Sequence, residues 1–249
     1  MFRRPSWIAL AGLALILGVA PSQARETVVF DEADPPFMFV ADGKPAGLYP
    51  VLVAEAARRA GIEVELASMP WKRALAEIDA GKAGVAGIYR NGERLKKYDF
   101  SDSLFDEVVL VYAPVGKGFA FAGLDSLRGK VVGVIRGWSY GDDFAAAVKS
   151  GTIATQEASG DAQNFVELAN GRIDAVLSIR ESGDAAIAAG GWTKRVLALD
   201  TPFAADSPTF IAFAKSTNKS AVLDSLNRAL AAMHADGGYD AIVASAWAH

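Results

Sequence analysis

The chain has 249 residues, with 25 Lys and Arg against 29 Asp and Glu, two His and no Cys. The absence of Cys excludes disulfides and thiol catalysis. Because both His residues, His234 and His249, lie near the C-terminus, we expect neither a His-based metal site nor a Ser-His-Asp triad. The net charge of −4 argues against nucleic acid as a partner. We expect no cofactor.

The first 24 residues have the three parts of a secretion signal. Phe2-Arg3-Arg4 is a basic start, residues 7–20 form an apolar run, and Ser22-Gln23-Ala24 is a small-x-small cleavage site. A membrane anchor is the alternative, but this run is shorter than the roughly 20 residues that span a bilayer. Without a Cys, lipid anchoring is also excluded. We therefore expect cleavage after Ala24 and a periplasmic protein.

The rest of the chain alternates short apolar strands with amphipathic helices. We predict strands over residues 27–30, 64–66, 85–89, 107–113, 130–135, 173–178 and 196–199, another near Ile153, and an apolar segment over 209–214. We predict helices over residues 50–60, 71–81, 140–149, 161–170 with Asp161 as the cap, 220–235 and 239–247. This alternation predicts parallel α/β sheets. Pro114 and the glycines after it predict a boundary between two lobes.

One segment occurs twice, 90 residues apart. Residues 75–90 read LAEIDAGKAGVAGIYR and residues 165–180 read FVELANGRIDAVLSIR, so Gly81 aligns with Gly171 without a gap. In each copy an apolar helical face ends at Gly and a basic residue, and an apolar strand follows. Chance similarity over so short a stretch is the alternative. A true repeat predicts two similar lobes, and clefts between domains are common sites for small ligands.

Arginines gather where predicted strands end, which is where α/β proteins place ligand contacts. Four of them in three such loops suggest an anionic ligand, because guanidinium pairs bidentately with carboxylate. The alternative for each is solvation or an ion pair with a nearby acid such as Glu93 or Glu181. The four are Arg90, Arg94, Arg136 and Arg180.

Residues 136–141, RGWSYG, open a predicted helix. Backbone N–H groups there, with the Ser139 hydroxyl, are suited to hold an anion; an ordinary helix cap is the alternative, and the two are compatible. Trp71 fits a pocket and the core equally well. The candidates for apolar walls of the cleft are Phe37, Trp71, Tyr89 and Trp138.

The order and spacing of several motifs resemble family 3 of the periplasmic solute-binding proteins, the polar amino-acid class. The resemblance covers essentially the whole chain after residue 24, although no single motif decides it. The motifs are PPF at 35–37, GKPAG at 43–47, GKAG at 81–84, GER at 92–94, YDFS at 98–101, LRGKVVGV at 127–134, GRIDAV at 171–176 and DGGY at 236–239.

The resemblance implies the two-lobe α/β fold of type II periplasmic binding proteins. Each lobe would be a mainly parallel sheet flanked by helices, and the lobes would close on a ligand about two hinge crossings. Lobe 1 would hold residues 25–112 and 204–249, and lobe 2 residues 113–203. The hinges would lie near Ala113 and Phe203.

The resemblance also implies roles for particular residues. Arg94 would bind the ligand's α-carboxylate, and Ser139 would add a hydroxyl from lobe 2. Gly87 and Tyr89 would line the same wall, and Trp71 would touch the ligand's side chain.

The chain departs from the family at Ile179. Amino-acid binders usually carry an Asp there, which pairs with the ligand's ammonium; here Ile179 is followed by Arg180. A buried ammonium without a counter-charge is costly. An ordinary α-amino acid is therefore disfavoured unless Asp31, Asp34 or Glu181 substitutes. The hypothesis is a ligand with one or more carboxylates and no obligatory ammonium.

The function implied is that of a monomer, without enzymatic activity, that binds a small polar or anionic solute and delivers it to an ABC permease. One alternative is a cyclohexadienyl (prephenate/arogenate) dehydratase on the same fold, with Glu93 or Glu181 as acid beside the arginines. Another is a sensor component that presents its ligand to a membrane partner.

Overall fold

The computed structural model describes residues 25–247, so the predicted secretion signal lies outside the described residues. The strands are β1 Glu26–Asp31, β2 Ala33–Asp34, β3 Met38–Ala41, β4 Lys44–Ala46, β5 Val64–Met69, β6 Gly84–Ile88, β7 Tyr98–Phe100, β8 Phe105–Pro114, β9 Val131–Ile135, β10 Ala154–Ala158, β11 Ala175–Ile179, β12 Val196–Ala198 and β13 Ala204–Ala214. The α-helices are α1 Leu48–Ala60, α2 Trp71–Asp79, α3 Gly92–Lys97, α4 Asp142–Lys149, α5 Asp161–Ala169, α6 Arg180–Gly190, α7 Ser220–Ala235 and α8 Gly238–Ala246.

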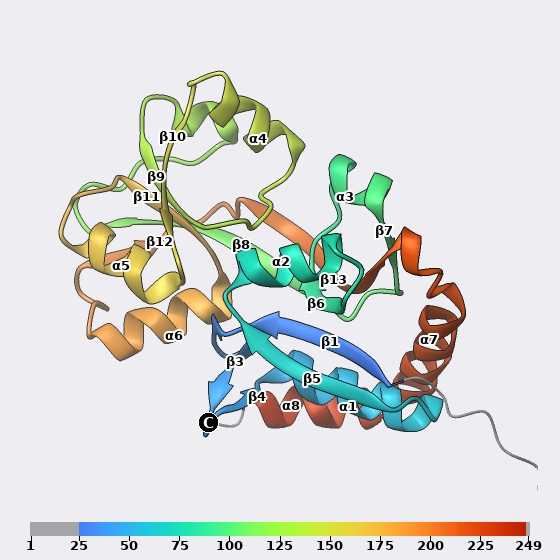
Figure 1. The fold of residues 1–249 in the computed structure, drawn as a ribbon. Coiled ribbons are helices and arrows are strands. Elements are labelled where there is room, and N and C mark those ends of the chain that lie inside the picture. The colour runs from blue at the N-terminus through green and yellow to red at the C-terminus, as the bar shows by residue number, and fades with distance from the viewer. Residues whose placement is uncertain (1–24, 248–249) are drawn as a thin grey trace, which may run out of the picture.

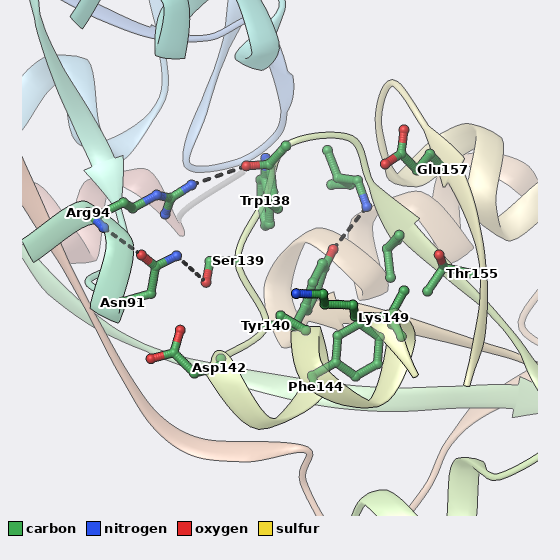
Figure 2. A pocket seen from close by; sticks show the side chains of 16 residues that line it. Asn91, Arg94, Trp138, Ser139, Tyr140, Asp142, Phe144, Lys149, Thr155 and Glu157 are labelled. Atoms are coloured by element: carbon green, nitrogen blue, oxygen red, sulfur yellow. Dashed lines mark hydrogen bonds between the residues drawn. The ribbon is translucent and has the colours of Figure 1, made fainter. Parts of the chain in front are cut away.

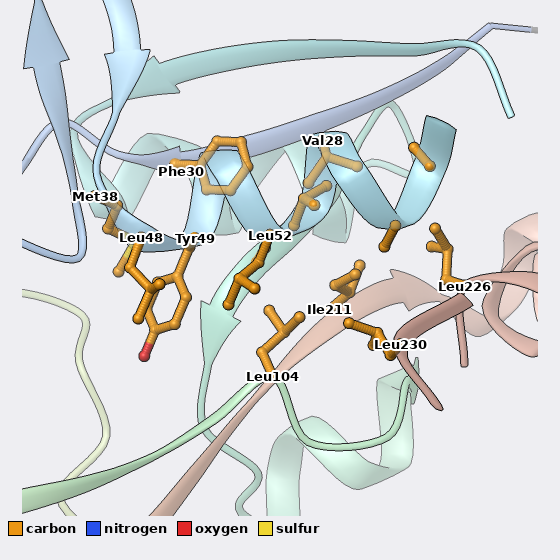
Figure 3. Packing of buried hydrophobic residues seen from close by; sticks show 14 of the residues in the cluster. Val28, Phe30, Met38, Leu48, Tyr49, Leu52, Leu104, Ile211, Leu226 and Leu230 are labelled. Atoms are coloured by element: carbon orange, nitrogen blue, oxygen red, sulfur yellow. The ribbon is translucent and has the colours of Figure 1, made fainter. Parts of the chain in front are cut away.

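The first lobe is built on β1, which lies between β5 and β6 and runs parallel to both. Helices α1, α7 and α8 pack together beneath this sheet, and α2 covers its other face (Figure 1). Apolar side chains of α1 and α7 meet those of β1 and β13 in the core, as Figure 3 shows for Phe30, Leu52, Ile211 and Leu230. The burial of these side chains is the main favourable term that holds the lobe together.

The second lobe is built on β9, which lies between β10 and β11 and is parallel to both. Helices α5 and α6 cover one face, where Phe165 and Ile187 pack with Tyr112. Phe144 of α4 packs with Val109 and Val134 in a separate cluster. The predicted fold class, two lobes that each hold a mainly parallel sheet flanked by helices, is confirmed.

The repeated segment forms the same unit in both lobes. In the first copy α2 ends before Gly81, whose φ is 66°, and in the second α5 ends before Gly171, whose φ is 70°. The next N–H donates back into each helix, from Lys82 to the Glu77 carbonyl and from Arg172 to that of Glu167, both at 3.0 Å. Each helix therefore ends in a left-handed glycine cap that turns the chain into β6 or β11.

Two long strands carry the chain between the lobes. β8 and β13 are antiparallel and pair with each other from Phe105↔Thr209 to Val109↔Ala204. β8 then continues beside β11, and β13 beside β6, so one sheet of ten strands runs through both lobes (Figure 1). Residues 109–112, assigned by sequence to the first lobe, pair with β11. Hinges near Ala113 and Phe203 stay a prediction.

Several local predictions need correction. α4 begins at Asp142 rather than at residue 140, because Gly141 with a φ of 91° interrupts the helical backbone. Asp161 does not cap α5; Gly160 occupies the cap position, and the Asp161 side chain accepts a hydrogen bond from Ser178. The sequence analysis did not predict α3, α6 or the small β2–β3–β4 sheet, since these segments are short or lack a clear apolar period.

Replacing Gly171 by Ala is expected to lower the free energy of unfolding by about 1 kcal/mol, because an L-residue is strained at positive φ. An added Cβ would meet no atom within 4 Å, so backbone conformation alone sets the cost. Urea denaturation measures it. Gly118→Ala is the control, since Gly118 is not left-handed and has room for a methyl group. Equal losses in both variants would contradict the account.

Candidate functional site

A narrow cavity lies where the lobes meet, at the ends of β6, β8 and β9. Its volume is about 10 Å³, room for about one water molecule. The cavity is too small to hold a solute in this arrangement of the lobes. The lining residues are Trp71, Gly87, Tyr89, Arg94, Glu107, Trp138 and Ser139. Six of these seven are residues that the sequence analysis assigned to the site.

Arg94 is held at the cavity by its neighbours on both lobes. Asn91 caps α3, accepting from the Arg94 backbone N–H at 2.8 Å and donating to the Ser139 hydroxyl at 3.0 Å. The guanidinium donates to the carbonyls of Tyr89 at 2.9 Å and Gly137 at 3.1 Å. Figure 2 shows the bond to Gly137 and the two bonds of Asn91. Only 8% of Arg94 is exposed, and burial lowers its pKa to about 10, so the side chain stays charged at neutral pH.

Arg94 has no ion-pair partner in the part of the chain that the structure describes. Two carbonyl contacts use two of the five guanidinium N–H groups. The remaining N–H groups are available to a carboxylate, which is the ligand chemistry that a guanidinium fits best.

Two tryptophans join the lobes across the cavity. Trp71 of the first lobe donates its indole N–H to the Gly137 carbonyl at 3.2 Å. Trp138 of the second lobe donates to the Asp31 carboxylate at 3.2 Å, and its ring meets that of Tyr89 edge-on at 6.4 Å. Trp71, the first residue of α2, is also buried in the first lobe's core against β6. Both interpretations of Trp71, core and pocket, therefore describe its position.

Gly87 is required by close packing. Its φ is 75°, and an added Cβ would lie 2.9 Å from the side chains of Met38 and Tyr49. The sequence analysis had assigned it to the cavity wall through the family resemblance, and the crowding shows why a larger residue does not fit there.

Two apolar residues of the predicted site lie outside the cavity lining. Phe37 is fully buried in the first lobe's core, where its ring stacks on Tyr49 with 5.4 Å between centroids. Ile179 is 1% exposed and packs in the same cluster. The prediction that Phe37 forms a wall of the cavity is therefore corrected. Its ring packs among the apolar side chains of the first lobe's core instead.

The other three arginines lie away from the cavity lining. Arg90 lies over the ring of Phe210, 3.7 Å from its centroid, and donates to the Ser101 carbonyl at 3.0 Å. Arg136 pairs with Glu157 at 3.0 Å on the surface. Arg180 is exposed in the first turn of α6. The structure brings one of the four arginines to the cavity.

Glu107 lines the cavity and was not recognised in the sequence. It is 2% exposed and accepts hydrogen bonds from the hydroxyls of Tyr49 and Tyr89. Burial raises its pKa to about 8, although the two hydroxyls oppose the shift. The sequence did contain a pattern that predicts its burial. Glu107 begins the apolar strand EVVLVYA, and an acid in a strand whose two faces are both covered cannot point to solvent.

Three buried aspartates lie in the same region, where the charges of Glu107, Asp161 and Asp31 all raise the pKa of Asp34. Asp31 and Asp34 lie at the end of β1 and in β2, and Asp161 begins α5. Burial raises the pKa of Asp31 to about 6 and that of Asp161 to about 7, and it raises the pKa of Asp34 well above its usual value. Each aspartate accepts one hydrogen bond from a neutral side chain. Asp31 accepts from the Trp138 indole, Asp34 from the Ser182 hydroxyl at 2.6 Å and Asp161 from the Ser178 hydroxyl at 2.7 Å.

Stability should fall as pH rises from about 4 to 8. The folded pKa values of Asp31, Asp161 and Glu107 lie above those of the unfolded chain, so the folded state holds more protons in this range. Unfolding then becomes easier with each proton released. Each 1 kcal/mol lost lowers Tm by roughly 2–4 °C in a domain of this size.

Calorimetry of the ligand-free protein between pH 5 and pH 8 measures this dependence. Glu107→Gln should reduce the slope, because it removes the group with a pKa of about 8. A Tm that rises over this range would contradict the assignment.

Comparison with known proteins agrees with this architecture. The L-cystine-binding protein TcyJ of Escherichia coli K12 is 29% identical over 211 residues, which are 84% of this chain and 77% of that protein. The structure of an ancestral arginine-binding protein bound to arginine superposes with a TM-score of 0.76 and 27% identity, over 90% of this chain and 98% of that one. A histidine kinase sensor domain shares the fold, with a TM-score of 0.80 at 22% identity, over 91% and 97%.

No helix among residues 25–247 combines the length and hydropathy needed to cross a bilayer. The sequence profile of the bacterial extracellular solute-binding proteins, family 3, matches residues 27–248. The match spans nearly the whole chain, and both lobes and their connecting strands lie within it. The protein belongs to family 3 of the bacterial extracellular solute-binding proteins.

Proposed function

We propose that this protein binds a small carboxylate-bearing solute between its lobes in the periplasm and delivers it to an ABC permease. The observation that carries the proposal is Arg94, a buried guanidinium without an acidic partner in the described residues, at a cavity shared by both lobes. The relatives named for L-cystine and arginine bind amino acids, which carry the carboxylate that Arg94 would hold.

The contacts across the cavity support a mechanism of closure. Trp71, Arg94 and Asn91 of the first lobe all bond to the loop at Gly137 and Ser139 of the second. Opening would break these bonds together, and a bound carboxylate would add a bridge from Arg94 toward the Ser139 hydroxyl. The solute would thereby stabilise the closed arrangement, as differential binding requires.

The cellular setting is part of the same proposal. Cleavage after Ala24 would release the protein into the periplasm as a monomer, and the closed form would be the one that the permease recognises. Arg94, Tyr89, Gly87, Ser139, Trp71 and Trp138 would form the site.

Arg94→Ala should abolish ligand-induced stabilisation, because the carboxylate loses its charged partner. Protein that has been unfolded and refolded to strip bound solute is screened by thermal shift against L-cystine, the standard amino acids, dicarboxylates and aromatic acids. A ligand at 100 times its Kd stabilises by about 2.7 kcal/mol, roughly 5–10 °C at this size. Arg94→Lys should retain part of the shift, since it keeps the charge but loses the bidentate geometry.

Arg128→Ala is the matched control, because Arg128 is exposed and pairs only with Asp125. It should leave the ligand shift unchanged. An unaltered shift in Arg94→Ala would remove the observation on which the proposal rests.

One observation bears on the dehydratase alternative. Glu107 lines the same cavity as Arg94, and its raised pKa of about 8 keeps it protonated at neutral pH, as a general acid requires. Its two tyrosine partners and its position against the cavity wall fit a structural acid equally well. Incubation with prephenate separates the two functions by the formation of phenylpyruvate, and for a binding protein we expect none.

A further inference from the structure

We propose that a groove over the paired strands β8 and β13 is a second binding site, which takes a small aromatic carboxylate and is distinct from the cavity at Arg94. A molecule bound there contacts both lobes. The groove is here called the ladder groove. Its lining includes Tyr89, Arg90, Tyr140, Phe203, Pro208 and Phe210.

The ladder groove has room that the Arg94 cavity lacks. Its volume is about 290 Å³, against about 10 Å³ for the cavity. Pockets for small ligands are on the order of 300–1,000 Å³, so the groove suits a molecule with a single ring. Tyr89 and Ser139 line both hollows, whereas Arg94 and Glu107 line the cavity and not the groove. The two hollows therefore adjoin without sharing their charged groups.

Aromatic side chains line the ladder groove from both lobes. Tyr140 precedes α4 in the second lobe, and its ring meets that of Phe203 edge-on at 6.4 Å. Tyr89 follows β6 and Phe210 lies on β13, beside β6 in the first lobe. Tyr89, Tyr140 and Phe203 are each half-buried, so part of each side chain is accessible to a ligand. Rings arranged in this way favour a ligand that is itself aromatic, through stacked or edge-on contacts.

Arg90 supplies the charge that selects a carboxylate. Its guanidinium lies 3.7 Å from the centroid of the Phe210 ring and donates one hydrogen bond, to the Ser101 carbonyl at 3.0 Å. Arg90 forms no ion pair with any residue in the range 25–247. Other N–H groups of the five therefore remain available. A guanidinium stacked on a ring suits bidentate pairing with a carboxylate.

Asp206 is the one acid among the residues that line the ladder groove. It is exposed on β13, so its repulsion of a carboxylate at Arg90 is screened by water and salt. Asp206 therefore does not reverse the preference for an anion that Arg90 establishes.

A ligand in the ladder groove should also affect the cavity, because the groove has walls from both lobes. A molecule that contacts Phe210 and Tyr140 together stabilises the arrangement of the lobes described here over any in which these walls are apart. If a solute at Arg94 requires this same arrangement, the two ligands strengthen each other's binding by equal factors. Only this coupling rests on the proposed function, whereas the site itself does not.

Three probes matched in ring and length separate the effects of charge: 3-phenylpropanoate is an anion, 3-phenylpropanamide is neutral and 3-phenylpropylamine is a cation. Hexanoate keeps the carboxylate and lacks the ring. Titration calorimetry on protein refolded to remove bound solute gives the Kd of each probe. We expect 3-phenylpropanoate to bind more tightly than the other three.

Arg90→Gln should weaken the binding of 3-phenylpropanoate about 10-fold, the lower end of the loss for a charged hydrogen bond, because Arg90 is exposed. It should also remove the preference for 3-phenylpropanoate over 3-phenylpropanamide. Arg90→Lys should keep part of that preference, because it keeps the charge but not the planar guanidinium. Arg94→Ala should keep all of it, since Arg94 does not line the ladder groove.

Arg136→Gln is the matched control, because Arg136 is an exposed arginine that pairs with Glu157 and does not line the ladder groove. A preference for the carboxylate that is lost in Arg90→Gln and kept in Arg94→Ala and Arg136→Gln would support the site. Loss in Arg94→Ala alone would mean that the probe binds in the cavity, which would overturn the inference and leave the proposed function intact. Binding by none of the four probes would also overturn the inference, whereas the proposed function is tested separately by its own panel of solutes.

The coupling is measured with L-cystine and L-arginine, each titrated with and without saturating 3-phenylpropanoate. The Kd of an amino acid that depends on Arg94 should fall by about 5-fold or more when the ladder groove is occupied. The fall should disappear in Arg90→Gln. A Kd that does not change would contradict the bridging of the lobes by the groove ligand.

Discussion

The pairing of β8 with β13 is the constraint on which the rest of the molecule depends. Between Phe105↔Thr209 and Val109↔Ala204 the two antiparallel strands belong to both lobes, and each then continues into a different sheet. Because the backbone hydrogen bonds of this ladder are satisfied in place, it joins the two lobes without interrupting the sheet of either. Glu107 lies within the shared segment, opposite Ser207. The buried acid of the cavity is thus fixed on the strand pair that joins the lobes.

The site contains buried basic and acidic side chains that do not form ion pairs with each other. Arg94 and the buried acids Asp34, Glu107 and Asp161 contact neutral donors and acceptors rather than each other. Burial of ionisable groups without a partner of opposite charge lowers the stability of the free protein. Tyr89 lies between the two kinds of group. Its carbonyl accepts a hydrogen bond from Arg94, and its hydroxyl donates one to Glu107.

Much of the fold could be predicted because it follows from local pattern. The repeat of helix, glycine and strand at Gly81 and Gly171 predicted two left-handed helix caps, because such a cap depends on the local sequence alone. Arg94 and Trp71 followed from the family resemblance. The grouping of the buried acids Asp34, Glu107 and Asp161 could not be predicted, because they come from β2, β8 and α5 and meet only through the long-range pairing of strands. Phe37 was misplaced for the same reason: sequence shows that a ring is apolar, but not which side of β3 it packs against.

Trp138 would give a closing motion of the lobes a measurable change in heat capacity. This residue of the second lobe packs against two separate apolar clusters of the first, one under α1 and the other beside α2. If the lobes parted, these apolar surfaces would be hydrated, and a solute that drew the lobes together would release that water. Burial of apolar surface lowers the heat capacity. The enthalpy of solute binding should therefore become steadily more favourable with increasing temperature, by an amount set by the protein's own surfaces as much as by the solute.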